Sequence, residues 1–462
     1  MCENHFDLPF KVLNLRLLTC DHAIQIIHRL LVMSYPQLQL DQPAFHCFTL
    51  STFGTRTAGL SWIRISVYPL ITMPIQPIAD TNTLAAFCDR QKDAEFVTVD
   101  TEFVREKTYY PILCLIQIAG PEDEVVIDAL APGIDLTPLA GLFGNPDILK
   151  VMHASRQDNE IFFNLFGEVP KPLFDTQIAA MVCGFGDQVA YGTLISKIVG
   201  ITLEKTSRYA DWSHRPLTEK QLVYALSDVT HLRTAYQSLA ADLEETGREN
   251  WLSSEMEILT DPATYRMDPR EAWKRIKSRT TNAKFLAVLR EVAAWREAQA
   301  QRRDIPRNRL LRDDSLLDIS AHTPNTADAL TRIRGIQRGF ADGRMAEGLL
   351  DAIARGVATP EEDRPQVDSR ERLPGGLGPL TDLLKTLLKL CCEEAKVAPK
   401  LIASADELER IAASNNADVP ALKGWRKEVF GERALALKSG RLGLTAQGKK
   451  IRLIDITNSD EG

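Results

Sequence analysis

The sequence predicts an α/β domain, with a mixed sheet and flanking helices, followed by two all-α helical blocks. Three observations lead to this fold class. Apolar, β-branched runs alternate with segments of helical periodicity up to about residue 259. Beyond Asp268 the strand signals nearly vanish, while helical spacing of apolar residues continues to about residue 444. A Pro/Gly-rich break at 365–379 divides this helical region in two.

Four candidate strands and five candidate helices make up the α/β part. The strands are apolar runs at 96–100, 113–119, 124–128 and 148–152. The first three lie close enough in sequence to form antiparallel hairpins, which fits a mixed sheet. The helices follow apolar spacing at 84–91, 159–166, 176–184, 191–199 and 219–243. Thr218 and Gln221 fit a capping box at the start of the last helix.

Two carboxylates lie together at the end of the first strand. Asp100 and Glu102 are two residues apart, so on a strand both point to the same face. Carboxylates so placed repel each other unless a cation lies between them. The residues leave open a second interpretation, in which both acids are solvated at a strand exit.

Two more acids and a tyrosine belong to predicted helices. Asp158 precedes the helix 159–166, where the helix dipole alone would also favour an acid. Tyr224 and Asp228 are four residues apart and share one helix face. Tyr224 has an alternative role as a half-buried aromatic with its hydroxyl at the surface.

Together these groups indicate a reaction class. Hard divalent cations such as Mg²⁺ and Mn²⁺ prefer oxygen ligands. A pair of them about 4 Å apart can clamp the attacking and the leaving oxygen of a phosphodiester. The four acids therefore suggest a two-metal nuclease.

The ordered set Asp-x-Glu, Asp, Tyr-x-x-x-Asp resembles the DEDDy 3′–5′ exonuclease superfamily, which has a ribonuclease-H-like fold. The surrounding sequence is similar to bacterial ribonuclease D from about Met73 to near the C-terminus. All four acids and the tyrosine are present, so nothing in the chain suggests an inactive nuclease. The segments that carry the resemblance are DTEFVR (100–105), TYYP (108–111), LCLIQ (113–117), DWSHRPL (211–217), REA (296–298), RDIP (303–306) and LRD (311–313).

This resemblance implies a domain organisation. It places a ribonuclease-H-like exonuclease domain at 73–260 and an HRDC domain at 282–360. It also implies a second HRDC-like domain at 377–455, whose assignment rests mainly on length and position. The RDIP and LRD segments resemble the start of the first HRDC domain.

The resemblance also implies a 3′–5′ exoribonuclease that trims the 3′ trailer of tRNA precursors and releases 5′-mononucleotides. Asp100, Glu102, Asp158 and Asp228 would be ligands of two Mg²⁺ or Mn²⁺ ions, with Asp100 bridging them. Tyr224 would orient the attacking water.

Other residues and functions stay open. Phe103 and Tyr109 are candidates to stack on the terminal bases, or equally to be core residues. The expected partners are tRNA precursors and other structured RNA with 3′ single-stranded ends, with no obligate protein partner evident. The alternatives are a DEDDy exonuclease acting on DNA, or an RNA-binding scaffold with a silent nuclease domain.

Charge, cysteine content and hydropathy limit the expected partners and cellular compartment of the protein. The formal net charge is −7, which argues against indiscriminate nucleic-acid binding. Residues 270–312 nevertheless hold 13 Lys or Arg against 4 Asp or Glu, which suggests a phosphate-facing surface or a solvated face. The 8 cysteines show no zinc-like spacing, so we expect a reduced, cytoplasmic protein. No apolar run reaches the roughly 20 residues that span a bilayer, so no membrane partner is expected.

Residues 1–72 differ from the rest of the chain. They show weak periodicity, and the early Glu3 and Asp7 make them a poor signal or transit peptide. Because the ribonuclease D resemblance begins at Met73, itself a plausible initiator, we expect a poorly structured extension that comes from an upstream start assignment.

Overall fold

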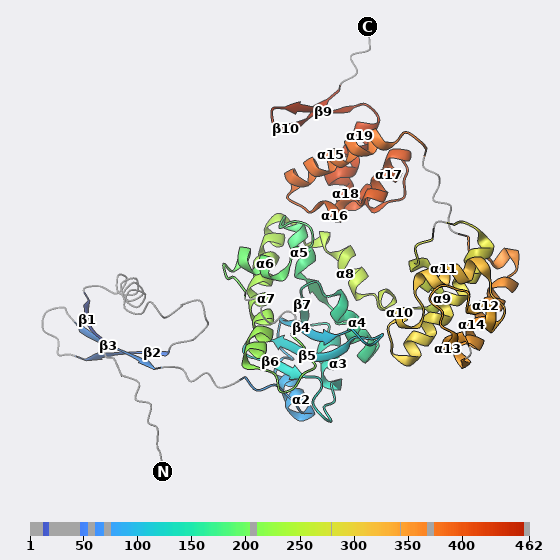
Figure 1. Ribbon diagram of the computed structural model, residues 1–462. Coiled ribbons are helices and arrows are strands. Elements are labelled where there is room, and N and C mark those ends of the chain that lie inside the picture. Colours follow the sequence, from blue (N-terminus) through green and yellow to red (C-terminus); the bar gives the residue numbers. More distant parts are fainter. Residues whose placement is uncertain are drawn as a thin grey trace, which may run out of the picture. The chain divides into compact units, whose positions relative to one another are not determined.

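The computed structural model divides into two compact units, residues 1–75 and 76–462. In the first unit, strands β1 (Leu13–Leu17), β2 (Cys47–Phe53) and β3 (Ser61–Tyr68) form an antiparallel sheet in the order β1-β3-β2 (Figure 1). The rest of the predicted extension lies outside the described residues, so its lack of a stable fold stays a prediction. The described residues are the backbone of these three strands, and then 75–203, 210–278, 280–341, 343–366 and 374–456.

A five-stranded mixed sheet organises residues 76–260, called here the α/β domain. Its order is β6-β5-β4-β7-β8. Strand β4 pairs antiparallel with β5, and β5 with β6, whereas β4, β7 and β8 run parallel. The predicted hairpins and mixed sheet are therefore confirmed. The strands are β4 (Phe96–Val104), β5 (Ile112–Ala119), β6 (Glu124–Asp128), β7 (Leu149–Met152) and β8 (Leu173–Asp175).

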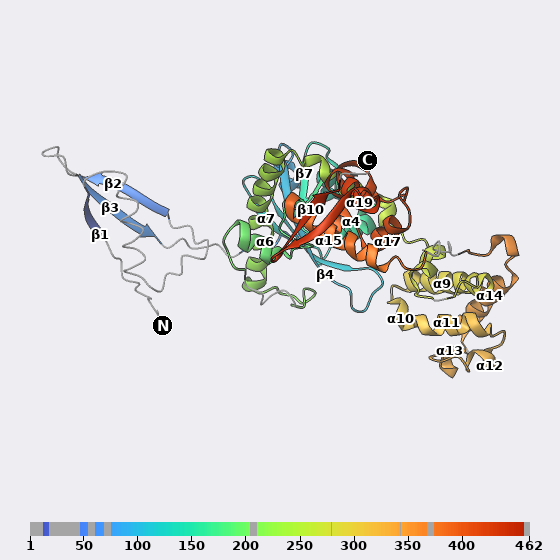
Figure 2. The same cartoon turned by 90° about the horizontal axis from the view of Figure 1, so that it is seen from above.

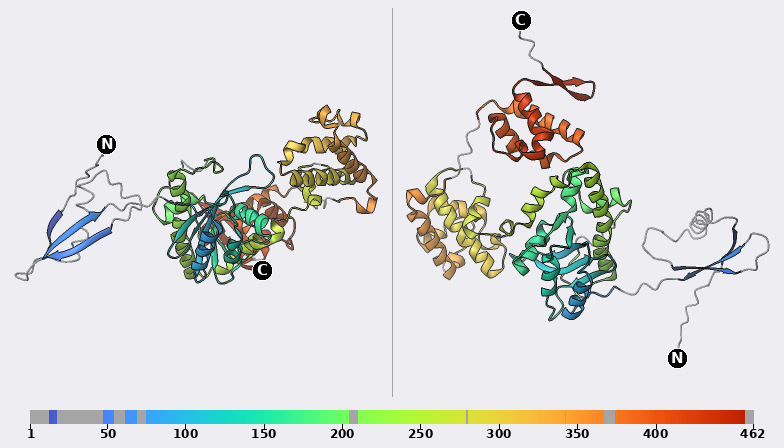
Figure 3. Two further views of the ribbon diagram at one scale, coloured as in Figure 1. Left: turned by 90° about the horizontal axis from the view of Figure 1, so that it is seen from below. Right: turned by 180° about the vertical axis from the view of Figure 1, so that it is seen from behind.

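Helices flank this sheet. The longest, α7, packs against β4, β5 and β6 and runs beside the sheet (Figure 3). Its predicted capping box is present, with the Thr218 hydroxyl accepting from the Gln221 backbone. The helices of this domain are α2 (Thr81–Arg90), α3 (Thr137–Gly144), α4 (Arg156–Phe166), α5 (Thr176–Val182), α6 (Tyr191–Ile198), α7 (Glu219–Thr246) and α8 (Ser253–Thr260), with the short 3₁₀ turn η1 (Glu249–Trp251).

Residues 262–366 form the first helical domain, which has its own core. Leu289 and Val292 of α9 pack with Leu316 of α11 and Leu349 of α14. These three helices lie side by side in Figure 2. The elements are η2 (Pro262–Thr264), η3 (Pro269–Arg275), α9 (Ala283–Arg303), α10 (Arg307–Leu310), α11 (Asp313–His322), α12 (Ala327–Leu330), α13 (Arg338–Ala341), α14 (Arg344–Ala358) and η4 (Glu361–Asp363).

Residues 374–456 form the second helical domain, and the prediction that this part is all-α is wrong. It ends in an antiparallel hairpin, because Leu442, Leu444 and Leu453 alternate to pack one face on the helices. Gly448, at φ 61°, permits the turn. The elements are α15 (Gly378–Ala395), α16 (Pro399–Ile402), α17 (Ala405–Ala413), η5 (Pro420–Leu422), α18 (Gly424–Arg426), η6 (Lys427–Gly431), α19 (Glu432–Lys438), β9 (Leu442–Gln447) and β10 (Lys450–Asp455).

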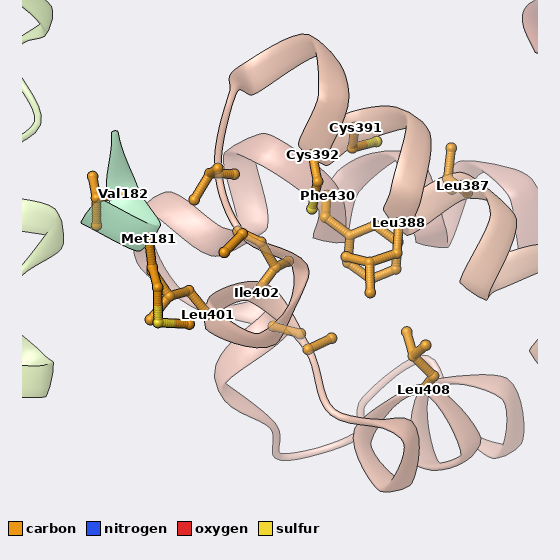
Figure 4. Packing of buried hydrophobic residues seen from close by; sticks show 14 of the residues in the cluster. Met181, Val182, Leu387, Leu388, Cys391, Cys392, Leu401, Ile402, Leu408 and Phe430 are labelled. Carbon is orange, nitrogen blue, oxygen red and sulfur yellow. The ribbon is translucent and has the colours of Figure 1, made fainter. Parts of the chain in front are cut away.

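The second helical domain shares its core with the α/β domain. Met181 of α5 lies beside Leu401 of α16 in a continuous apolar cluster (Figure 4). The backbone N–H of Ala398 donates to the carbonyl of Met181 at 2.8 Å. Trp251 and Trp425 stack with ring centroids 4.2 Å apart. Across the described ranges, no helix has the length and apolar character needed to cross a membrane.

Candidate active site

Three of the predicted acids meet where β4 faces α7. Asp100 and Glu102 are half-buried on β4, and Asp228 is buried on α7. One carboxylate oxygen from each lies within 4.8 Å of the other two. Residues 100 and 102 thus share a face, as the two-residue spacing predicted.

Two hydroxyl groups fix α7 at the level of these acids. The Thr98 hydroxyl donates to the carbonyl of Val229 at 2.8 Å. Thr98 lies two residues before Asp100, so both side chains point to the α7 side of the sheet. The Tyr191 hydroxyl on α6 donates to the carbonyl of Asp228 at 2.6 Å. The turn that carries Asp228 is therefore held from the sheet and from α6.

The fourth acid, Asp158, lies in the first turn of α4 and is buried. Its carboxylate accepts a hydrogen bond from the Thr101 hydroxyl. Asp158 does not belong to the group within 4.8 Å, but its charge raises the pKa of both Asp100 and Glu102. The structure therefore brings Asp158 next to the cluster.

The turn before α4 is shaped by a residue that the sequence did not single out. The buried Asp175 carboxylate accepts from the backbone N–H groups of Ala154 at 3.1 Å and Ser155 at 2.8 Å. The Ser155 hydroxyl donates to the same carboxylate at 2.9 Å. Ala154 has φ 56°, in the left-handed region, so these bonds hold a strained turn that directs the first turn of α4 toward β4.

Tyr224 lies one helical turn before Asp228 on α7. Burial raises the pKa of its phenol, and the charges of Asp228, Glu102 and Asp100 raise it further. The ring centroid lies 6.1 Å from that of the buried Trp212. Tyr224 therefore keeps its proton at neutral pH and faces the acids.

The acids are costly to charge in the absence of cations. Burial raises the pKa of all four: that of Asp100 well above its usual value, that of Glu102 to about 9, and those of Asp158 and Asp228 to about 7. The Oδ1 atom of Asp228 is buried without a hydrogen-bond partner among the described residues. Such a set of oxygen donors, repelling and incompletely hydrogen-bonded, fits divalent cations.

The two candidate stacking residues lie in different settings. Phe103 is half-buried and packs against the core of the α/β domain. Tyr109 is buried: its hydroxyl donates to Glu297, and its backbone N–H donates to the Asp304 carboxylate at 3.0 Å. This geometry favours a structural contact with α9 for Tyr109, and the stacking role of both residues stays a prediction.

The raised pKa values predict how stability depends on pH. In the unfolded chain these carboxyls have pKa values of about 4. The folded, cation-free protein therefore binds more protons than the unfolded chain between these pKa values. These groups contribute fully to the free energy of unfolding below the unfolded-state pKa, and the contribution is lost as pH rises through about 7 to 9. We expect the free energy of unfolding in EDTA, measured with urea, to fall between pH 5 and pH 9. With saturating Mg²⁺ the decline should shrink, whereas an equal decline with and without Mg²⁺ would contradict cation binding by these acids.

Two protein-family models match this chain, one in the α/β domain and one in the first helical domain. The family model described as 3′-5′ exonuclease matches residues 75–244. The HRDC domain model matches residues 285–353, within the first helical domain.

The alignments with three similar proteins span nearly the full length of those proteins. A ribonuclease D of Gluconacetobacter diazotrophicus is 50% identical over 377 residues, which are 82% of this chain and 96% of that protein. A ribonuclease D of Granulibacter bethesdensis is also 50% identical, over 378 residues with the same coverage. Among solved structures, Escherichia coli RNase D, described as an exoribonuclease involved in structured RNA processing, is 30% identical. That match has a TM-score of 0.68 and covers 79% of this chain and 99% of the other.

Proposed function

Because the chain belongs to the ribonuclease D family and is a metal-dependent 3′–5′ exoribonuclease, we propose that it trims the 3′ trailers of tRNA precursors. The products would be 5′-mononucleotides. The observation that carries this proposal is the meeting of the Asp100, Glu102 and Asp228 carboxylates within 4.8 Å. The description of the E. coli relative, which processes structured RNA, supports an RNA substrate with a folded body.

Within this site, Asp100, Glu102, Asp158 and Asp228 would hold two Mg²⁺ or Mn²⁺ ions. When bound, such cations supply an activated water and stabilisation of the 3′-oxygen leaving group. Asp158, buried beside Thr101, and Asp228, whose Oδ1 has no hydrogen-bond partner among the described residues, would add oxygens from two helices to those of the β4 acids. The site thus receives ligands from three separate elements.

Tyr224 would orient the attacking water. Its pKa is raised, so the phenol does not abstract a proton at neutral pH. A protonated hydroxyl can instead hydrogen-bond the water and direct it at the phosphorus in line with the leaving oxygen. The contact with Trp212 limits the movement of the ring.

The first helical domain would hold the body of the RNA. Not all of the cations in 270–312 are available for this. Arg270 pairs with Glu291 and Lys274 with Glu271, and Arg296 is buried beside Asp313. Exposed cations that form no ion pair with another described residue are Arg275, Lys277, Lys284, Arg302, Arg303, Arg309 and Arg312.

Substitution of these exposed cations should weaken RNA binding in a salt-dependent way. We expect the triple variant Lys284→Ala, Arg309→Ala, Arg312→Ala to bind a tRNA precursor with a salt slope lower by roughly one unit per lost phosphate contact. Cleavage of short single strands should be unchanged, because the acids lie in another domain. Affinity measured across a salt series tests this. Variants at the ion-paired Arg270 and Lys274 are the controls. Equal salt slopes for all of these proteins would show that the exposed cations face solvent and do not contact phosphate.

The activity itself is tested with the full chain on a 3′-extended tRNA precursor, beside single-stranded DNA, with Mg²⁺ or Mn²⁺. We expect release of 5′-mononucleotides from the RNA until the trailer is removed. Preferential digestion of the DNA would favour the DNA-directed alternative. Binding of the precursor without cleavage would favour the scaffold.

Three further features complete the proposal. The second helical domain would be HRDC-like, although the HRDC model matches the first domain. A cytoplasmic location is supported by the free cysteines Cys88, Cys114, Cys183, Cys391 and Cys392. No obligate protein partner is needed by the mechanism, since every proposed ligand comes from this chain.

A further inference from the structure

One buried side chain next to the acids has no role in the mechanism above. Gln117 on β5 is directly opposite Asp100 on β4, and its side chain is 0% exposed. Directly opposed residues of antiparallel strands point to the same side of the sheet. The Gln117 amide therefore lies on the α7 side of the sheet, on the strand adjacent to Asp100.

The amide of Gln117 is unusual because its hydrogen-bonding groups are unused. Neither Oε1 nor Nε2 has a hydrogen-bond partner in the described part of the chain. Burial of an unpaired amide is unfavourable, and native proteins avoid it. The residues two positions away on the same face are Leu115 and Ala119, both buried and apolar. A Leu or Met would suit such surroundings, so packing does not explain the amide.

A second buried glutamine shows what a structural role looks like. Gln91 in the same domain is 1% exposed, and its Nε2 donates to the Asp123 carboxylate at 2.5 Å. That bond ties the end of α2 to the β5–β6 turn. Gln117 forms no comparable bond, and the charged group closest to it in the strand register is Asp100.

We propose that Gln117 is a positioning residue of the cation site, whose amide N–H donates to the Asp100 carboxylate when cations are bound. This inference rests on the proposed function, which makes Asp100 a cation ligand. A carboxylate that binds a cation is normally held by further hydrogen bonds that fix its orientation. In the described residues no side chain donates a hydrogen bond to Asp100, and Gln117 is the buried donor directly across the strand pair.

The test compares Gln117→Met with the unaltered chain and with Gln91→Met. Methionine keeps the length and approximate volume of glutamine but has no amide. For Gln117→Met we expect Mn²⁺ affinity, measured by calorimetry, to fall about 10–100-fold. Its stability in EDTA should be unchanged or higher, because an unpaired buried amide is removed. Gln91→Met should show the opposite pattern, with unchanged Mn²⁺ affinity and lower stability.

The outcomes separate the two proposals. If the unaltered chain does not bind Mn²⁺, the proposed function and this inference both fail. If it binds Mn²⁺ and Gln117→Met binds it equally well, only the inference is overturned. Gln117→Leu, which matches the neighbouring Leu115, gives a second variant if Gln117→Met does not fold. Loss of stability in EDTA with full Mn²⁺ affinity in both would identify an ordinary core residue.

Discussion

Asp100→Asn should abolish exonuclease turnover while the fold stays intact. Asp100 lies at the centre of the acids, and its pKa is raised by burial and then by the charges of Asp158, Asp228 and Glu102. Asparagine keeps the shape but removes the negative charge that a cation requires. Because one of several repelling groups is lost, stability without cations should be unchanged or slightly raised.

Two measurements check this expectation: the rate of mononucleotide release with Mg²⁺, and urea unfolding in EDTA. Asp93→Asn is the control, since Asp93 is exposed and outside the site. A near-normal rate for Asp100→Asn would remove Asp100 from the mechanism. A clear loss of stability in EDTA would show that Asp100 has a structural role instead.

Tyr224→Phe should lose most of the rate but keep RNA and cation binding. The ring still packs beside Trp212, so only the hydroxyl that faces the acids is lost. Groups that position water or transfer protons typically contribute on the order of 10²–10⁴-fold to the rate. The maximal rate at saturating RNA should therefore fall by that factor, with Mn²⁺ affinity unchanged.

The same helix offers a matched control for this variant. Tyr236 lies twelve residues further along α7 and packs its ring against Phe96 and Phe174. Tyr236→Phe should leave the rate nearly unchanged. A change of less than about threefold in Tyr224→Phe, against the 10²-fold or more expected of a water-positioning group, would mean that Tyr224 is also only a packing residue.

Features that depend on local sequence could be predicted from it. The Asp100–Glu102 spacing correctly predicted a shared strand face, and the Thr218–Gln221 pair correctly predicted the start of α7. The hairpins β4–β5 and β5–β6 followed from short connections. The strand β8 was not predicted, because three residues are too few to show a period.

Contacts between distant residues could not be predicted in this way. The bond from Thr98 to Val229 joins residues 131 positions apart, and the one from Tyr109 to Glu297 spans 188. Asp175 directly precedes the helix predicted at 176–184, and in the structure it is the N-cap of α5. Only the fold shows that its carboxylate holds the turn that precedes Asp158.

The apolar cluster shared by α5, α7 and the second helical domain bears on the order of folding during synthesis. The first helical domain closes its core from residues 272–353 alone, so it can fold as soon as it leaves the ribosome. The α/β domain is made earlier, yet Met181, Leu243 and Leu252 pack against partners between Leu384 and Leu442. That surface stays uncovered until the last part of the chain emerges. The nascent protein therefore exposes an apolar surface while its middle domain is being synthesised. Chaperones would be expected to bind at this surface.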